Sequence, residues 1–208
     1  MLDRSLLRRP APELVEAVVA AGVDWVQVRE RDLGGEALRA LAQDVLEAAR
    51  RGAARRAGVA RVLVNRRIDV ALAVGADGVH LGWDAVSPAQ ARSLLGPRAE
   101  IGVSAHAPEE IDPDGGASYA HLAPVFAPLS KTSERAARGL DTLARAVARG
   151  VPVLAQGGIT PERAREVVAV GAAGVAVTGA LLAADDPAAV ARAFRDALDG
   201  QRAALQST

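Results

Sequence analysis

Residues 151–182 read VPVLAQGGITPERAREVVAVGAAGVAVTGALL, and this stretch indicates the fold. Its two short apolar runs, 151–155 and 174–177, have the length of buried strands. Between them lies an amphipathic segment that begins at Pro161, and proline is favoured at the first position of a helix. The stretch therefore predicts a strand, a helix and a second strand parallel to the first.

A glycine-containing turn follows each of these strands. Gly157 and Gly158 follow the first strand, and Thr178 and Gly179 follow the second. Turns that end two neighbouring parallel strands present converging backbone N–H groups, which can bind a phosphate. In an eight-stranded β/α barrel the phosphate commonly lies after the last two strands. We therefore expect a phosphate site here. The alternative is that the glycines only permit tight turns.

Composition narrows the class of protein. The 208 residues suit one β/α-barrel domain, expected over residues 1–200, with a frayed tail at 201–208. The chain has no cysteine, which excludes disulfides and thiolate metal sites, and its formal net charge is zero, which gives no basic face for nucleic acid or membrane. No apolar run is long enough to span a bilayer and no signal peptide is visible, so we expect a cytoplasmic protein.

An internal repeat favours a barrel. Four segments share the pattern Gly-x-x-x-apolar-x-apolar, where x is any residue. They are 22–28, 75–81, 116–122 and 171–177. Their glycines are 53, 41 and 55 residues apart, about two βα units each time. Three further apolar runs lie between or before them: 61–64, 101–103 and 151–155. Together they predict an α/β fold, a (β/α)8 TIM barrel in which the repeats are the even-numbered strands.

Only seven strands are visible by this count. A first strand should precede the helix expected at 10–21, yet only Met1 and Leu2 are available before Asp3. We therefore expect either that the barrel is open at this point or that the native start lies upstream of Met1. Side-chain alternation predicts that one interior layer is formed by Gln27, His80, His121 and Ala176.

The helices are expected where the apolar spacing is helical. Besides 10–21, they are predicted at 35–51, 68–74, 88–95, 140–149, 161–170 and 186–198. Polar side chains gather after the strands, at the end of the barrel where substrates bind: Gln27, Arg29, Arg31, Asn65, Ser104, Ser130 and Lys131. Arginine, lysine and hydroxyl groups in one pocket predict a substrate with more than one phosphate group. Of the 25 basic residues only Lys131 is a lysine. Because lysine carries a compact charge that an arginine fork cannot always replace, we take Lys131 as a candidate site residue.

Six motifs in order resemble the thiamine phosphate synthase / TenI superfamily along nearly the whole chain. They are VQVRERD (26–32), VNRRIDVALAVGADGVHLG (64–82), IGVSAH (101–106), APVFAPLSK (123–131), AQGGIT (155–160) and VAVTGA (175–180). The resemblance implies a β/α barrel in thiamine biosynthesis, with a thiazole phosphate held by the two glycine turns. It also implies that this phosphate is joined to an aminopyrimidine pyrophosphate with release of pyrophosphate.

The resemblance assigns roles to individual residues. Gln27 would contact the pyrimidine, and Ser104 would lie near the reacting centre. The pyrophosphate would be held by Arg29, Asn65, Ser130 and Lys131. Arg31 belongs to the same strand end as Arg29, and we expect it to bind substrate as well.

Magnesium is the cofactor that the resemblance implies, and here the sequence departs from the pattern. The two acids that hold the metal in the synthases fall on Arg66 and Ala85, and Asp84 is only a weak candidate ligand. We therefore expect Arg29, Arg66 and Lys131 to hold the pyrophosphate, with magnesium use in doubt.

Two alternatives to the synthase remain open. One is a TenI-like thiazole tautomerase, which needs no metal, although its catalytic histidine falls on Pro124. His121 could supply a proton from below the pocket, or could simply fill the barrel interior with His80. The other alternative is a non-catalytic thiazole phosphate binder with a regulatory role. A homodimer is compatible with the sequence.

Overall fold

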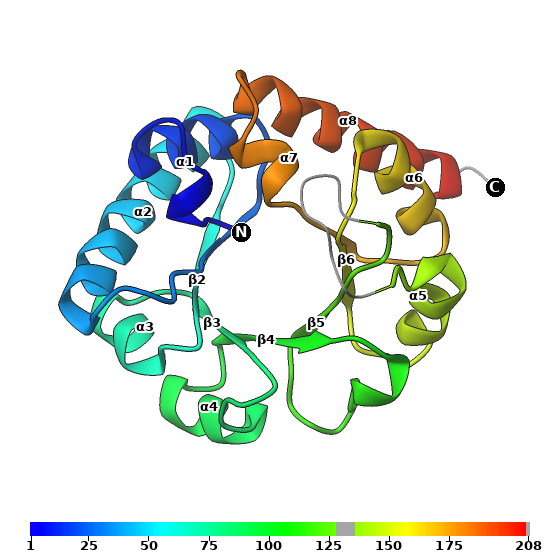
Figure 1. Cartoon of the computed structure of the whole chain (residues 1–208), viewed down its shortest axis with the longest axis horizontal. Helices are drawn as coiled ribbons and strands as arrows, with labels where there is room; N and C mark the ends of the chain where they lie inside the picture. The colour runs from blue at the N-terminus through cyan, green and yellow to red at the C-terminus, as the bar shows by residue number, and fades with distance from the viewer. Residues whose placement is uncertain (128–135, 207–208) are drawn as a thin grey trace.

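A curved parallel sheet organises the molecule. The structure, a computed structural model, describes residues 1–127 and 136–206. Within these residues, seven strands pair in chain order, each parallel to the next. They are β1 (Trp25–Val28), β2 (Arg61–Asn65), β3 (Gly78–Leu81), β4 (Glu100–Ala105), β5 (Tyr119–Leu122), β6 (Val153–Gln156) and β7 (Gly174–Ala176). The helices lie outside the ring of strands (Figure 1). The predicted barrel-like α/β fold is confirmed.

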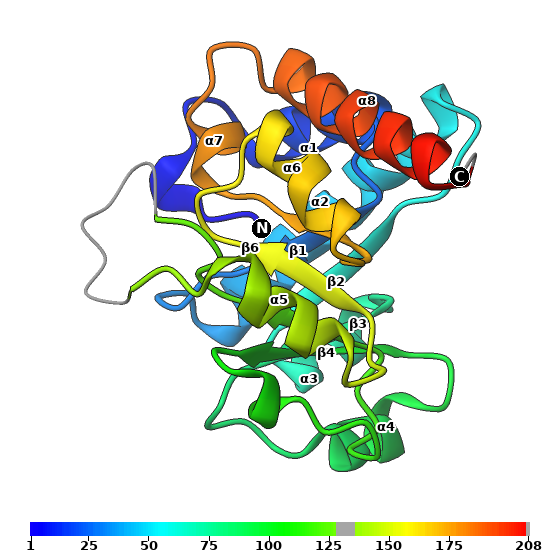
Figure 2. The same cartoon turned by 90° about the vertical axis from the view of Figure 1, so that its right-hand side faces the viewer.

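The helices follow the pattern expected from the sequence. They are α1 (Ala11–Ala20), α2 (Gly35–Arg55), α3 (Ile68–Val74), α4 (Pro88–Leu95), α5 (Gly139–Val147), α6 (Pro161–Ala169), α7 (Gly179–Leu182) and α8 (Pro187–Gln206), with 3₁₀ helices η1 (Arg4–Leu6) and η2 (Pro108–Glu110). The side chain of Thr160 caps α6, and Ser87 and Gln90 form a capping box at the start of α4. α8 packs against both α1 and α6 and so joins the first and last parts of the ring (Figure 2).

Met1 and Leu2 occupy the gap between β1 and β7. The N–H of Leu2 donates to the carbonyl of Gln27 at 2.8 Å, and the Leu2 carbonyl accepts from the N–H of Arg29 at 3.1 Å. On the other side, the Met1 amine donates to the carbonyl of Val177 at 2.8 Å. These two residues therefore stand where a first strand would lie, and they connect the edge strands only near their carboxyl ends.

α2 runs further than the sequence predicts, and Gly52, the first residue beyond the predicted range, lies inside the helix. A Cβ on Gly52 would come within 2.6 Å of the carbonyl oxygen of Glu16 on α1. Glycine at this position thus allows α1 and α2 to pack closely, and α2 continues to Arg55 instead of stopping at residue 51.

The last helix also extends beyond the prediction. α8 passes through Gly200 and continues to Gln206. Arg202 donates to the carbonyl of Ala173, at a distance of 2.6 Å, which ties this part of the helix to the segment before β7. The described part of the tail, residues 201–206, is therefore helical, where the sequence indicated fraying.

The barrel interior is unusually polar, whereas the layer between sheet and helices is built from Ala, Val, Leu and Ile. The buried polar side chains are Gln27, Asn65, His80 and His121. The imidazole rings of His80 and His121 lie 4.3 Å apart between centroids, and Gln27 donates from Nε2 to Oδ1 of Asn65 at 3.1 Å. Among the described residues, no helix has the length and apolar character needed to cross a bilayer.

Candidate functional site

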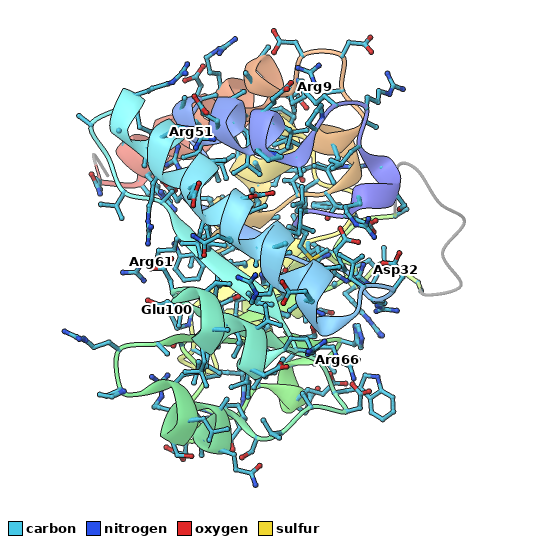
Figure 3. The ribbon with its side chains drawn as sticks, turned by 90° about the vertical axis from the view of Figure 1, so that its left-hand side faces the viewer. Arg9, Asp32, Arg51, Arg61, Arg66 and Glu100 are labelled. Atoms are coloured by element: carbon cyan, nitrogen blue, oxygen red, sulfur yellow. The ribbon has the colours of Figure 1, made fainter. Side chains whose placement is uncertain are left out.

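The candidate site lies at the carboxyl ends of the strands. Because all strands are parallel, the residues that follow them meet at one end of the barrel. Arg66, at the end of β2, lies on the same side of the molecule as Asp32, which follows β1 (Figure 3). Arg61, at the start of β2, pairs with Glu100 at the opposite side. Arg61, the first residue of β2, and Arg66, which directly follows its last residue, therefore lie at opposite ends of the barrel.

Arg66 forms an ion pair with Asp84, which lies in the loop after β3. Its backbone N–H donates to the carbonyl of His80 at 2.9 Å, so Arg66 extends the pairing of β2 with β3. The hydrogen bond from Arg66 is the main cause that lowers the pKa of the Asp84 carboxyl below its usual value, and the charge of Arg31 adds to it. Arg31, Arg66 and Asp84 are therefore electrostatic neighbours.

Arg29 extends this cationic group. Its side chain is about one quarter exposed, and its Nη1 lies 3.6 Å from Oδ2 of Asp3. Burial lowers the pKa of Arg29, and the charge of Arg31 lowers it further. Arg29 and Arg31 thus repel each other at the mouth of the barrel, and a polyanionic ligand between them would relieve that repulsion.

The carboxylates near the mouth are engaged by arginines. Arg4 contacts both Glu30 and Asp32, with distances of 3.4 and 3.0 Å. Asp3 faces Arg29, and Asp84 faces Arg66. Among residues 1–127 and 136–206, no group of three His, Cys, Asp or Glu side chains could hold a metal ion.

The donor set does not fit a magnesium ion. Mg²⁺ needs hard oxygen ligands in a nearly octahedral arrangement, and carboxylates are its usual protein ligands. The family pattern places a metal-binding acid at each of two positions. At the first position this chain has Arg66, which brings a positive charge. At the second it has Ala85, whose methyl group packs against the hydrophobic core. Asp84, the weak candidate ligand, is paired with Arg66.

A second polar group leads from the mouth into the interior. Ser104 is exposed at the end of β4, and its Oγ lies 2.9 Å from Nε2 of His80. The other ring nitrogen of His80 lies 3.1 Å from the hydroxyl of Tyr119. Burial is the main cause that lowers the pKa of His80 to about 4, so its ring is neutral at physiological pH. A neutral imidazole donates through one nitrogen and accepts through the other, which suits its position between two hydroxyls.

His121 lies in the interior and not at the mouth. It is 5% exposed, and burial lowers its pKa well below the usual value, although a hydrogen bond to the side chain of Gln156 opposes that shift. Its Nδ1 has no hydrogen-bond partner among the described residues. The position agrees with the interpretation that His80 and His121 fill the barrel. Sequence reasoning gave His80 no chemical role, and only its contact with Ser104 connects it to the site.

The first glycine turn is closely packed. Gly157 and Gly158 have φ of +95° and +62°, which glycine adopts readily. A Cβ on Gly157 would lie 2.7 Å from Cβ of Pro124, and one on Gly158 would lie 2.3 Å from the carbonyl oxygen of Ala127. Packing against residues 124–127 is therefore sufficient to explain these two glycines, so the turn alone does not establish a phosphate site.

The second turn carries an unsatisfied polar atom. Thr178 precedes the short helix α7 and does not cap it with its side chain. Its Oγ1 is buried and has no hydrogen-bond partner among the described residues. A buried hydroxyl without a partner is costly, so this oxygen indicates that a ligand group would be accommodated beside Gly179.

Two expected site residues cannot be placed. Ser130 and Lys131 lie outside the described residues.

Trp83, next to Asp84, is 91% exposed. A mostly apolar cavity of about 470 Å³ opens where β1 faces β7, and Trp25, Val175 and Phe194 are among its lining residues. Gln27 and His121 also line it, whereas Arg29, Arg31 and Arg66 do not.

Comparison with known proteins agrees with the resemblance seen in the sequence. The model of a family described as thiamine monophosphate synthase matches residues 2–181. A thiamine-phosphate synthase from Chloroflexus aurantiacus is 42% identical over 186 residues, which cover 88% of this chain and 82% of that protein. The thiamine biosynthesis bifunctional protein ThiM/ThiE from Symbiobacterium thermophilum is 44% identical over 188 residues, covering 89% of this chain but only 38% of that longer protein.

A solved structure shows the same fold. Thiamine phosphate pyrophosphorylase from Pyrococcus furiosus superposes with a TM-score of 0.81 and 29% sequence identity. The match covers 96% of this chain and 93% of the other.

Proposed function

The chain belongs to the thiamine monophosphate synthase family, and we propose that it is a transferase that joins a thiazole phosphate to an aminopyrimidine pyrophosphate. The products are thiamine phosphate and pyrophosphate. The observation that carries the proposal for this chain is the group of Arg29, Arg31 and Arg66 at one end of the barrel, because a departing pyrophosphate needs its charge neutralised.

The reaction exchanges one bond for another. The bond between the pyrimidine methylene carbon and the pyrophosphate oxygen breaks, and its electron pair leaves with the pyrophosphate. The thiazole nitrogen supplies the pair that forms the new carbon–nitrogen bond. No oxidant or reductant is needed, and the task of the protein is to orient the two substrates and stabilise the leaving group.

The thiazole phosphate is assigned to the glycine turns. The buried Oγ1 of Thr178, which has no partner within the described part of the chain, supports this assignment, since a phosphate oxygen would give that hydroxyl an acceptor. In α7 the N–H groups of Leu181 and Leu182 donate to the carbonyl of Thr178, so the N–H groups of Gly179 and Ala180 would be the added donors. Gly157 and Gly158 would contribute backbone N–H groups beside them.

The pyrimidine is assigned to the interior side of the site. Gln27 donates to Asn65, and its buried Oε1 has no hydrogen-bond partner among the described residues, so this oxygen could accept from an amino group of the ring. Ser104, held by His80, would lie near the reacting carbon. Ser130 and Lys131 are assigned to the pyrophosphate on the resemblance alone. His121 receives no role in the reaction, because its side chain is buried in the interior beside His80.

The family typically uses Mg²⁺, and the donor set of this chain does not fit that ion. No step is therefore assigned to a metal. Among the described residues, Arg29, Arg31 and Arg66 are the groups that would neutralise the leaving pyrophosphate.

Mass spectrometry of product mixtures tests the proposal. The full chain is incubated with thiazole phosphate alone, with aminopyrimidine pyrophosphate alone, and with both, in the presence of magnesium. We expect thiamine phosphate only when both substrates are present. Isomerisation of the thiazole phosphate alone leaves its mass unchanged and is followed by NMR; it would favour the tautomerase. Unchanged substrates in every mixture would leave a binding protein.

A further inference from the structure

Arg66 has a backbone conformation that is unusual for its residue type. Its φ is +67°, in the left-handed region where glycine, asparagine and aspartate are most common. An arginine there is strained relative to a relaxed conformation. Strain of this kind is found most often at functional sites, so the conformation of Arg66 motivates a hypothesis about its function.

The surroundings leave room for this guanidinium. A Cβ on Gly82 would lie 3.3 Å from Oδ1 of Asp84 and 3.7 Å from Nη1 of Arg66. Glycine at position 82 therefore keeps the space beside the ion pair clear of side-chain atoms. The pair itself is more than one third exposed on both sides, and exposed pairs of this type contribute little to stability.

We propose that Arg66 is a catalytic residue that replaces the metal, binding the pyrophosphate of the substrate directly, with Asp84 as the counter-ion that it releases when the pyrophosphate arrives. The proposal rests on the function proposed above and identifies how that site neutralises its leaving group. The pyrophosphate carries more negative charge than one carboxylate, and its oxygens match the planar fork of a guanidinium. The charge of Arg31 acts on Asp84 and on Arg29, so these two arginines add positive charge at the same end of the barrel.

Charge and electrons balance without a further component. As the carbon–oxygen bond breaks, the electron pair remains on the pyrophosphate oxygen, and guanidinium N–H groups donate hydrogen bonds to the growing negative charge. Arginine stays protonated throughout, so no proton is transferred from Arg66.

Titration calorimetry with inorganic pyrophosphate tests the proposal independently of turnover. The full chain is titrated in excess EDTA and again in excess Mg²⁺. We expect binding in EDTA that magnesium does not strengthen. Arg66→Asn, whose side chain suits the left-handed conformation, should weaken binding roughly ten- to hundredfold. Arg61→Gln is the matched control on the same strand, and it should leave binding unchanged because Arg61 lies at the opposite end of the barrel.

Asp84→Asn separates the proposal from a metal site. If Asp84 only competes for Arg66, removing its charge should strengthen pyrophosphate binding in EDTA. If Asp84 is a magnesium ligand, the same change should weaken binding in magnesium. The proposal is overturned if Asp84→Asn weakens binding in magnesium, or if the unchanged chain binds pyrophosphate only when Mg²⁺ is present. It is also overturned if the unchanged chain does not bind pyrophosphate in either buffer. The product mixtures described above would still decide the proposed function, because they do not depend on the metal-free result.

Discussion

The Oγ of Ser104 lies 2.9 Å from Nε2 of His80, so an exposed hydroxyl at the mouth of the barrel is held by a buried imidazole. We expect Ser104→Ala to lower kcat roughly tenfold, with a smaller change in KM, because it removes a hydroxyl placed near the reacting carbon. Ser104→Thr keeps the hydroxyl and should retain much of the activity. Steady-state kinetics of both variants check this expectation, and equal kcat values for Ser104→Ala and the unchanged chain would contradict it.

The burial of His80 predicts how stability depends on pH. The folded pKa is about 4 and the unfolded value is 6.5, so the unfolded chain binds more protons between these values. The free energy of unfolding should therefore fall as the pH drops from 6.5 to 4, by on the order of 3 kcal/mol from this one group. Urea denaturation at several pH values measures the slope. His80→Gln should flatten it, and an unchanged slope would show that His80 does not titrate as stated.

Thr178→Val tests the second turn without changing its shape. The valine removes a buried hydroxyl that has no partner among the described residues, so the unliganded protein should be slightly more stable. Thiazole phosphate should raise the melting temperature of the unchanged chain by ligand linkage and that of the variant much less. Thermal melts with and without the ligand give both values. An equal shift in the two proteins would mean that Thr178 does not contact the phosphate.

Gly102 provides a test of the interior. A Cβ there would lie 2.3 Å from the Tyr119 hydroxyl oxygen and 2.6 Å from Nδ1 of His80. Gly102→Ala should therefore lower the free energy of unfolding by roughly 1–3 kcal/mol by overpacking. Gly200→Ala is the control, because Gly200 lies within α8 and an added methyl group meets nothing within 4 Å. It should stabilise the chain by about 0.5–1 kcal/mol. Denaturation curves of both variants decide the comparison.

The strands were the most predictable part of the fold. The last four residues of three repeat segments, 25–28, 78–81 and 119–122, match the observed strands to the residue, because each follows a turn and carries apolar residues that must be buried. The errors arose at the ends of the helices predicted at 35–51 and 186–198, which both continue through a glycine. Gly52 allows two helices to approach each other, and Gly200 is tolerated within α8.

The sequence predicted which residues belong to the site better than it predicted which of them contact one another. Parallel topology brings Arg29, Asn65 and Ser104 to one end of the barrel, and this follows from sequence order alone. The pairing of Arg66 with Asp84 depends on how the loop after β3 returns over the strand ends, which no local pattern encodes. The contact of His80 with Ser104 likewise depends on the register of β3 with β4.

Pyrophosphate release without a metal is the most direct test of the whole account. Phosphorus NMR follows the full chain with thiazole phosphate and aminopyrimidine pyrophosphate in excess EDTA. The account predicts that pyrophosphate and thiamine phosphate appear in equal amounts, and that Arg66→Asn slows both while Arg61→Gln slows neither. If the mixture releases pyrophosphate only after magnesium is added, or not at all, the central claim that arginines neutralise the leaving group in this chain is contradicted.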